Sequence, residues 1–433
     1  MTKKTLLVVG AGGFIGGFIC GEGLRRGFDT YAGVRESTSR RYLGDPALHI
    51  VDFDYDSPSD LGRQLREAVP EGGWDMIIYN LGATKALNFG DFNRINFEYL
   101  RNFTEALERN KLMPEKFLYM SSLSALGEAD EKNYTPIDST TVPHPNTRYG
   151  LSKIKSEMYL ETHPEIPWII FRPTGVYGPH EKDYLMMIEC IDRHFDFGVG
   201  YRKQLLTFIY VDDLVGAMFD ALASDKTLHR KYIISEPRAY TQTEFRAIVA
   251  KALGRKAVVP IKLPLWAAYV ASYVAEKWSH ISLKPSTLNR DKFKIMRQRN
   301  WNCSVAEAEA ALPPVHDVAV GIHHVRFDVS TEETAYAGHS GEQVHNLAAG
   351  SIGYNLKVLE NRCGALAVEA QSVHAERVEV GDLAGVCTFG LFRGVESEYE
   401  VAHLGTVKFG ELIEGAETRK FVRKRMRIHP AAA

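Results

Sequence analysis

The N-terminal part of the chain alternates short apolar runs with amphipathic segments. Its first run, at residues 6–9, leads through a glycine-rich stretch into a helical pattern at 14–26. Later apolar runs lie at 30–34, 74–79, 116–120 and 168–171, and helical patterns lie at 58–69, 93–109 and 149–161. Short apolar runs are typical of strands buried on both faces, and strands separated by helices pair in parallel through right-handed crossovers. We therefore predict that residues 1–170 form an α/β unit with a doubly wound parallel sheet.

The pattern changes after residue 171. Loop-rich sequence is followed by helical patterns at 211–223, 242–253 and 265–277, which predict a smaller substrate subdomain over 171–325. The last of these patterns places Trp266, Tyr269 and Tyr273 on one face, an arrangement typical of core packing, with the wall of a substrate pocket as the alternative. From about residue 326, short alternating segments with many glycines predict an additional β-rich module over 326–433, which ends near a basic stretch at 419–427.

Composition and charge narrow the classes of function. The chain of 433 residues carries 52 basic and 54 acidic side chains, so no field of the whole chain would attract nucleic acid or an anionic membrane. No apolar run is long enough to span a bilayer. The five cysteines lie far apart, which fits neither a disulfide framework nor a zinc cluster and favours a cytoplasmic location. His316, His323 and His324 have no carboxylate or cysteine at ligand spacing, so we expect no metal site.

The glycine-rich stretch GAGGFIG near the N-terminus has the context of a dinucleotide site. It follows an apolar strand and opens a helix, whose first residues are Phe14 and Ile15. In such a unit Gly10 permits the turn out of the strand, Gly13 lets the backbone approach a pyrophosphate, and Gly16 lets helix and strand pack closely. The pyrophosphate is then bound by free amides at the helix N-terminus. Residues 1–170 would then be the mainly dinucleotide-binding part of the chain. A purely structural turn is the alternative.

The residues that end the second and third strands bear on the choice of cofactor. A carboxylate at the end of the second strand would accept hydrogen bonds from the ribose of NAD, whereas an arginine would bind the 2′-phosphate of NADP. Arg35 occupies this place and Glu36 follows it, so we predict NADP, with NAD as the alternative. Asp52 and Phe53 end the third strand, where Asp52 would contact the adenine; a turn-capping or helix-capping role is the alternative for Asp52.

A second group of residues can carry proton chemistry. Tyr149 and Lys153 are spaced to lie on one face of a helix, and a nearby ammonium lowers the pKa of a tyrosine. Upstream, Ser121, Ser122 and Ser124 follow an apolar strand, at the edge where open α/β sheets bind ligands. A serine hydroxyl at that edge can orient a substrate carbonyl. Either feature alone is also common on ordinary surface helices and turns.

Together these stretches resemble the extended short-chain dehydrogenase/reductases, in the group called the NAD-dependent epimerase/dehydratase family. The resemblance covers about residues 4–325 and rests on GAGGFIG, DMIIYNLGA, LYMSS, RYGLSK, FRPTGVYGP and FIYVDDL, in this order. It implies a Rossmann-type fold with Tyr149 as general acid/base and Lys153 as its partner. Ser122, five residues before Gly127 as in the family, becomes the hydroxyl that orients the carbonyl. The resemblance also implies a cofactor site that includes Tyr149, Lys153, Leu81, Gly82, Ala83, Asn96, Pro173 and Thr174.

Departures from the family pattern indicate a branch. Asn80 stands where histidine is frequent, and Leu126 stands where the sugar-nucleotide epimerases have tyrosine. Residues 263–312 instead resemble the branch that contains 3β-hydroxysteroid dehydrogenases and dihydroflavonol reductases. This likeness implies an NAD(P)-dependent oxidoreductase that interconverts a secondary alcohol and a ketone on a fairly apolar ring substrate. It also implies a homodimer formed through the helices at 93–109 and 149–161.

Two other functions remain as alternatives. A sugar-nucleotide epimerase would retain NAD and use it transiently. A non-catalytic NADP(H)-sensing scaffold would bind the cofactor to regulate a partner, but the complete set of Ser122, Tyr149 and Lys153 disfavours it, since a sensor needs no proton donor.

Overall fold

The computed structural model describes residues 3–86, 89–282 and 288–313, and four strands between residues 366 and 408. The chain divides into two units, Met1–Ile322 and His323–Ala433. This division lies just before the domain boundary expected at 325/326.

A seven-stranded parallel sheet forms the centre of the first unit, with the order β11-β6-β5-β4-β1-β2-β3. Its strands are β1 (Thr5–Val9), β2 (Asp29–Val34), β3 (His49–Asp52), β4 (Met76–Tyr79), β5 (Lys116–Met120), β6 (Trp168–Pro173) and β11 (Lys231–Ile234). β1, β4 and β5 are buried along their whole length, because helices cover both faces. The strand order reverses between β1 and β4, where doubly wound sheets open a crevice for ligands. The predicted Rossmann-type sheet is therefore confirmed.

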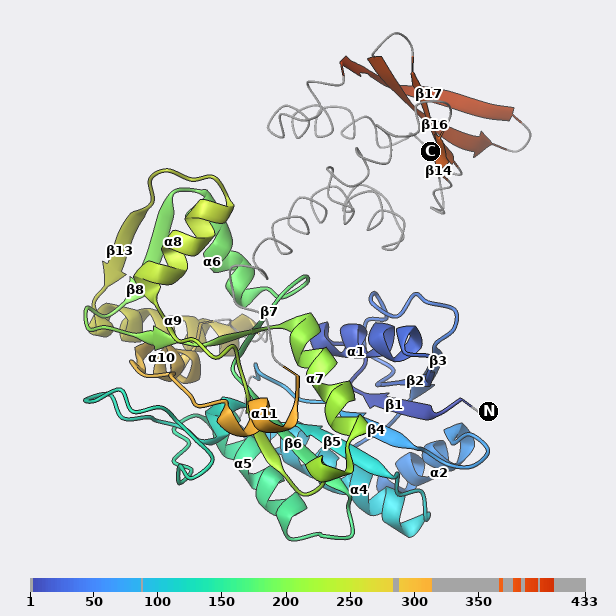
Figure 1. Ribbon diagram of the computed structural model, residues 1–433, viewed down its shortest axis with the longest axis vertical. Helices are drawn as coiled ribbons and strands as arrows, with labels where there is room; N and C mark the ends of the chain where they lie inside the picture. The colour runs from blue at the N-terminus through green and yellow to red at the C-terminus, as the bar shows by residue number, and fades with distance from the viewer. Residues whose placement is uncertain are drawn as a thin grey trace. The chain divides into compact units, whose positions relative to one another are not determined.

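Helices lie on both faces of this sheet (Figure 1). Those on one face are α1 (Phe14–Arg25) and α7 (Val211–Ala223), and those on the other are α2 (Pro58–Ala68), α4 (Tyr99–Arg109) and α5 (Arg148–Glu161), with the short α3 (Phe89–Asn93) ahead of α4. α2 shows how local sequence sets a helix start. Ser57 accepts a hydrogen bond from the amide of Asp60, and Pro58 occupies the first helical position, where no amide donor is needed.

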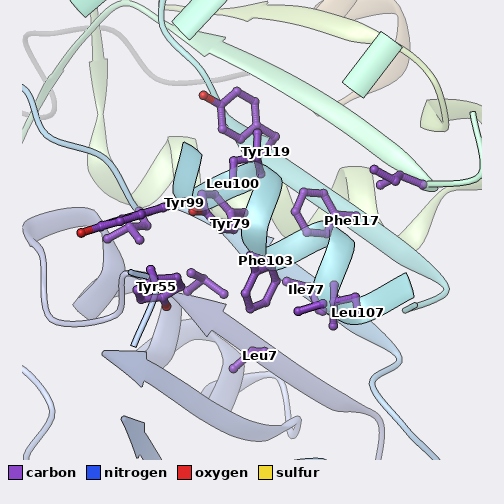
Figure 2. Packing of buried hydrophobic residues seen from close by; sticks show 14 of the residues in the cluster. Leu7, Tyr55, Ile77, Tyr79, Tyr99, Leu100, Phe103, Leu107, Phe117 and Tyr119 are labelled. Carbon is purple, nitrogen blue, oxygen red and sulfur yellow. The ribbon is translucent and has the colours of Figure 1, made fainter. Parts of the chain in front are cut away.

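The main apolar core packs α4 against the centre of the sheet. Phe103 and Leu107 of α4 lie over Ile77 and Tyr79 of β4 (Figure 2). The rings of Tyr79 and Phe103 have centroids 5.5 Å apart. All four side chains are buried, so the core fixes β4 and thereby the loop that leaves its carboxyl end.

The second half of this unit is a smaller subdomain. Its elements are β7 (Gly175–Tyr177), α6 (Asp183–Asp192), β8 (Phe195–Val199), β9 (Leu205–Leu206), β10 (Phe208–Tyr210), β12 (Tyr240–Thr241), α8 (Gln242–Ala252), β13 (Val259–Leu263), α9 (Leu265–Ser282), α10 (Arg290–Arg297) and α11 (Ala306–Ala311). β8 and β13 pair in parallel, and β7 with β10 and β9 with β12 form two further small sheets. The helices predicted at 211–223 and 242–253 are confirmed to within one residue.

The aromatic face of α9 does not lie in the core. Trp266, Tyr269 and Tyr273 are exposed, whereas the helix buries the small residues Ala268 and Ser272. The prediction that this stripe packs in the core is therefore wrong. α9 contacts the subdomain through these small side chains and through Tyr269, whose ring centroid lies 5.4 Å from that of Phe293 in α10, while Trp266 remains exposed.

In the second unit, the described residues form a four-stranded antiparallel sheet with the order β14-β15-β16-β17. The strands are β14 (Leu366–Val368), β15 (Arg377–Asp382), β16 (Val386–Val395) and β17 (Glu398–Lys408). They agree with the β-rich character predicted for 326–433, while the basic stretch at 419–427 lies outside the described residues. None of the helices in the described part of the chain is long and apolar enough to cross a membrane.

Candidate active site

The glycine-rich turn joins β1 to α1 with little space around its backbone. Gly10 has a φ of +85°, and a Cβ there would lie 2.7 Å from the amide nitrogen of Leu81. A Cβ at Gly16 would lie 2.3 Å from the carbonyl oxygen of Gly10. At Gly13, which directly precedes α1, the nearest contact would be an ordinary 3.5 Å, so the protein itself leaves room for a methyl group. Gly10 thus serves the close approach of the loop after β4, and Gly16 serves the crossing of strand and helix, whereas any need for glycine at Gly13 comes from a ligand.

The first turn of α1 is suited to an anion. No side chain caps this helix at Gly13, and the first amides of an α-helix have no partner within the helix. The helix dipole adds partial positive charge at the same end. The turn can therefore bind a pyrophosphate with backbone donors alone.

A cavity of about 1150 Å³ extends from this turn into the subdomain. Its walls include many of the residues predicted from the sequence, namely Gly10, Gly13, Phe14, Ile15, Arg35, Leu81, Gly82, Ser122, Tyr149, Lys153, Pro173 and Thr174. These residues lie at the carboxyl ends of strands or at the starts of helices, along the edge where the sheet order reverses. The structure thus brings the glycine turn and the Tyr149–Lys153 pair into one cavity.

Other predicted residues lie outside the cavity wall. Gly16 is one helical turn away, packed on the backbone of Gly10. Asp52 forms an exposed ion pair with Arg40, with 2.7 Å between the charged atoms. Phe53 is buried in the main core. The adenine contact expected of Asp52 therefore stays a prediction that competes with this ion pair.

Asn96 and Ala83 support the wall from behind. Asn96 is buried in a π-helical turn, Arg94–Glu98. Its Oδ1 accepts a hydrogen bond from the amide of Ala83 at 2.7 Å, and its Nδ2 donates to the Ala83 carbonyl at 3.1 Å and to the Ser152 hydroxyl at 2.8 Å. Because Ser152 adjoins Lys153 in α5, Asn96 ties the loop after β4 to the helix that carries the predicted proton donor.

Tyr149 and Ser122 meet where α5 touches the loop after β5. Thr147 caps α5, and a Cβ at Gly150 would lie 2.3 Å from the carbonyl oxygen of Ser124, so the helix begins in direct contact with the serine loop. Burial raises the pKa of Tyr149 to about 12, although a hydrogen bond with the Ser122 hydroxyl lowers it. A phenol and a hydroxyl that are hydrogen-bonded to each other and face a cavity can together bind a carbonyl or alcohol oxygen.

The neighbouring serine has a different partner. The Ser121 hydroxyl donates to the buried carboxylate of Glu157, which also accepts hydrogen bonds from Arg172 at 2.5 and 3.0 Å. Sequence reasoning missed this buried network. Glu157 lies one helical turn beyond Lys153, so the spacing that relates Tyr149 to Lys153 was a signal for it.

Lys153 is buried beside the end of β5. Its amino group donates to the carbonyl of Met120 at 2.6 Å and lies 5.9 Å from the centre of the Tyr149 ring. Burial lowers the pKa of Lys153 to about 7, while the negative charge of Glu157 raises it. The sequence suggested that Lys153 would lower the pKa of Tyr149, but in the structure burial of the phenol prevails. A lysine with this pKa changes its charge near neutral pH when an anion binds nearby.

Arg35, at the end of β2, has an unsatisfied guanidinium nitrogen. Its Nε is buried and makes no hydrogen bond within the described residues. The side chain lines the cavity beside Thr38, whose Oγ1 accepts a hydrogen bond from the Arg35 amide at 3.3 Å. An unpaired buried donor is costly, and a phosphate would satisfy it. Glu36, the competing carboxylate, is exposed. The residues present therefore fit a dinucleotide that carries an anionic group at this end.

The opposite end of the cavity is largely apolar. Its lining there includes Met186, Met187, Phe197, Leu206, Leu263, Ala268 and Met296. Two of its lysines, Lys85 and Lys292, both bind Asp183, at 2.9 and 2.8 Å. These three charged residues come from separate segments of the chain, so no local sequence pattern predicts that they form a cluster. Within the residues that the structure describes, no group of histidine, cysteine, aspartate or glutamate side chains could hold a metal ion.

The sequence profile of the NAD-dependent epimerase/dehydratase family matches residues 6–235, which carry both the glycine turn and the Tyr149–Lys153 pair. The chain belongs to this family. It is accordingly an enzyme of the extended short-chain dehydrogenase/reductase type, and its family is NAD-dependent, in agreement with the dinucleotide character of the cavity.

Its relatives include reductases and epimerases. A ceramide reductase of Caulobacter vibrioides is 24% identical over 323 residues, which cover 74% of this chain and 93% of the relative. An uncharacterised UDP-glucose epimerase of Bacillus subtilis is 23% identical over 307 residues, 66% of this chain and 92% of the relative. Among solved structures, the UDP-glucose 4-epimerase of Thermus thermophilus in complex with NAD is 20% identical, covers 75% of this chain and 99% of its own, and has a TM-score of 0.59. At this identity the structural likeness shows the fold.

Proposed function

We propose that the protein is an NADP(H)-preferring oxidoreductase that interconverts a secondary alcohol and a ketone on an apolar substrate. The observation that carries the proposal is the position of Ser122, Tyr149 and Lys153 in one cavity, between a dinucleotide-fitting end and an apolar end. When bound, the nicotinamide supplies or accepts the hydride. The protein supplies position, a proton and electrostatic support.

Tyr149 is the proton donor in the direction of reduction. Its hydroxyl, held by Ser122, gives its proton to the substrate oxygen as the carbonyl is reduced. Ser122 donates a hydrogen bond to the same oxygen and stabilises the charge that develops there. Lys153, when protonated, favours the phenolate that Tyr149 becomes. In the direction of oxidation each of these steps runs in reverse.

The apolar end of the cavity favours a ketone over a sugar nucleotide. A nucleoside diphosphate needs cations that can bind its phosphates. Of the three described lysines that line this end, Lys85 and Lys292 are both bound to Asp183, and Lys182 is exposed. Met186, Phe197 and the other apolar side chains of that end offer contacts to hydrocarbon instead. The name of the ceramide reductase relative agrees with a lipid-like substrate. The sugar-nucleotide epimerase is the second candidate, because other relatives are UDP-glucose epimerases.

Arg35 supports the preference for NADP(H). Its buried, unpaired Nε would be satisfied by the 2′-phosphate. The two carboxylates that could favour NAD are not part of the cavity wall: Glu36 is exposed and Asp52 pairs with Arg40. The homodimer and the cytoplasmic location stay predictions of the sequence.

Turnover of two substrate sets tests the proposal. The protein is incubated with NADPH or NADH and a panel of ring and long-chain ketones, and separately with UDP-glucose and added NAD. We expect oxidation of the reduced cofactor with an apolar ketone. Epimerisation of UDP-glucose without net change of cofactor would instead support the second candidate.

Substitution of the proton donor tests the mechanism. Tyr149→Phe should lower turnover by about 10²–10⁴-fold, the usual contribution of a positioned general acid, with little change in cofactor affinity. The matched control is Tyr201→Phe, because Tyr201 is an exposed tyrosine. Turnover by Tyr149→Phe at the level of the control would remove Tyr149 from the mechanism.

A further inference from the structure

α9 presents a large apolar face to solvent. Trp266 is 71% exposed and Trp278 is 68% exposed, and Val270, Tyr273 and Val274 on the same side of the helix are also exposed. We call these five residues the outer face of α9. Their spacing is that of one continuous helical stripe.

The polarity of α9 is the reverse of that of an ordinary surface helix. Such a helix buries its apolar stripe and exposes its charges, yet α9 buries Ala268 and Ser272. No described helix is apolar enough to cross a bilayer, so the stripe does not mark a transmembrane span. A helix with tryptophan and tyrosine on one exposed face suits the plane of a membrane interface, where the aromatic rings lie at the level of the lipid headgroups.

The outer face adjoins the mouth of the cavity. β13 leads directly into α9, and Leu263 at its end is exposed and also lines the cavity. Phe197 of β8 and Met186 of α6 are likewise both exposed and part of the cavity wall. Ala268 and Ala271 bring α9 itself into that wall. In Figure 1, α9 lies between the β8–β13 pair and α10. The same elements therefore form the apolar outside of the subdomain and the entrance to its pocket.

The charges around this face favour an anionic surface. The acidic residues of β8 and α9 are both neutralised, since Asp196 pairs with Arg246 at 3.2 Å and Glu276 pairs with Arg290 at 2.9 Å. Lys262 of β13 and Lys277 of α9 are exposed. Neither lysine has an acidic partner among the described residues, so local positive charge remains although the whole chain is close to neutral.

We propose that the outer face of α9 docks on the surface of an anionic lipid bilayer, from which the apolar substrate enters the cavity. The docking is inferred from the outer face of α9 and the charges around it, whereas the entry of substrate rests on the proposed function. A protein partner seated on the same face would cover the mouth of the cavity. A bilayer instead supplies apolar molecules to that mouth, anchors Trp266 and Trp278, and attracts Lys262 and Lys277.

Vesicle flotation with the full-length protein tests the docking. The vesicles consist of phosphatidylcholine with or without phosphatidylglycerol. The wild-type protein should float with the vesicles that contain phosphatidylglycerol. Trp266→Ser combined with Trp278→Ser should lower partitioning roughly tenfold or more, because two large apolar side chains lose their burial in lipid. Lys262→Gln and Lys277→Gln should each lower it roughly fivefold, and only when phosphatidylglycerol is present.

A matched control keeps the result interpretable. Val142→Ser alters an apolar residue that is 69% exposed but far from α9 in the chain, and it should float like the wild type. Circular dichroism and the melting temperature show whether each variant is folded. Because all these residues are at the surface, we expect no large change in either.

Several outcomes would overturn the proposal. It fails if the wild-type protein does not float with anionic vesicles, or if the tryptophan variant floats as well as the wild type. It also fails if the tryptophan substitutions convert a dimer to a monomer in size-exclusion chromatography, since the face would then be an interface between chains. Flotation needs no turnover, so a protein that docks but reduces no ketone refutes the proposed function alone.

Turnover tests the entry of substrate. The best ketone of the panel is presented in a long-chain form within vesicles and in a short-chain form in solution. The tryptophan variant should lose turnover of the former in proportion to its lost flotation and keep turnover of the latter. Equal loss on both forms would refute delivery from the bilayer.

Discussion

An added methyl group is expected to have different effects at two glycines of the GAGGFIG stretch: at Gly16 it should lower stability, and at Gly13 it should lower the affinity for NADPH. Gly16→Ala places a Cβ 2.3 Å from the Gly10 carbonyl oxygen and 2.7 Å from that of Ala11. Ordinary contacts of this kind begin near 3.4 Å, so helix and strand must separate by about 1 Å. Gly13→Ala places its Cβ 3.5 Å from the Gly10 oxygen, an ordinary contact. The backbone of Gly13, with φ −84° and ψ 172°, is also open to alanine.

The magnitudes follow from these distances. Overpacking costs about 1–3 kcal/mol and more where backbone atoms must move, so Gly16→Ala should lower the free energy of unfolding by at least that amount. Gly13→Ala should cost no more than ~1 kcal/mol, the effect of alanine at a helix N-cap. If a pyrophosphate passes over Gly13, the added methyl occupies its place. The dissociation constant for NADPH should then rise roughly tenfold or more.

Thermal unfolding and calorimetric titration with NADPH measure the two effects separately. Gly16→Ala should lower the melting temperature by several degrees, at about 2–4 °C per kcal/mol for a domain of a few hundred residues. Gly13→Ala should melt within about 4 °C of the wild type yet bind NADPH weakly. Wild-type affinity in a folded Gly13→Ala protein would show that the pyrophosphate does not approach Gly13, and the assignment of the turn as a cofactor site would fall.

Three further predictions concern charged groups of the site. Arg35→Ala should lower the affinity for NADPH roughly 10–150-fold, because a charged hydrogen bond is lost, and should change the affinity for NADH by no more than about twofold. An equal loss of affinity for both cofactors would refute binding of the 2′-phosphate by Arg35. Because burial holds the pKa of free Lys153 near 7 and a bound anionic cofactor raises it, binding above pH 7 should take up protons and weaken as pH rises. Calorimetry in buffers of different ionisation heat measures the uptake, which should disappear in Lys153→Met; uptake that persists in this variant would assign it to another group. Glu157→Gln leaves the buried charge of Arg172 unpaired and should lower the free energy of unfolding, measured with denaturant, by about 3–5 kcal/mol. The control Glu67→Gln breaks an exposed pair with Arg63 and should lower it by less than ~1 kcal/mol. Equal losses of stability would contradict the importance of burial.

The architecture of the first unit followed from local pattern. The runs at 6–9, 116–120 and 168–171 became β1, β5 and β6 with bounds that differ by at most two residues. Strands buried on both faces need no alternation, so their apolar runs stand out from the amphipathic helices between them. Helical crossovers between consecutive strands then require the strands to pair in parallel, which is why a parallel sheet could be predicted from the sequence.

The site was predictable only in part. The glycine turn and the Tyr149–Lys153 pair can be recognised in the sequence because each depends on spacing within one helix or turn. The cluster of Lys85, Asp183 and Lys292 cannot be recognised in this way, because its members lie far apart in the chain and meet only in the folded protein. The exposed aromatic face of α9 also escaped prediction. Its periodicity shows that the residues share a face, but which face is buried depends on the element that packs against the helix.

By itself the sequence determined the doubly wound sheet, the place of the dinucleotide turn, and the candidate proton donor with its lysine. These are properties of neighbouring residues, and short-range sterics and hydrogen bonding suffice to specify them. Only the tertiary structure decided that Ser121 bonds to the buried Glu157, how far burial shifts the pKa of Lys153, and which residues form the apolar end of the cavity. Each of those depends on desolvation and contact between distant segments, and the free energy of a charge or an apolar surface is set by the neighbours that folding gives it.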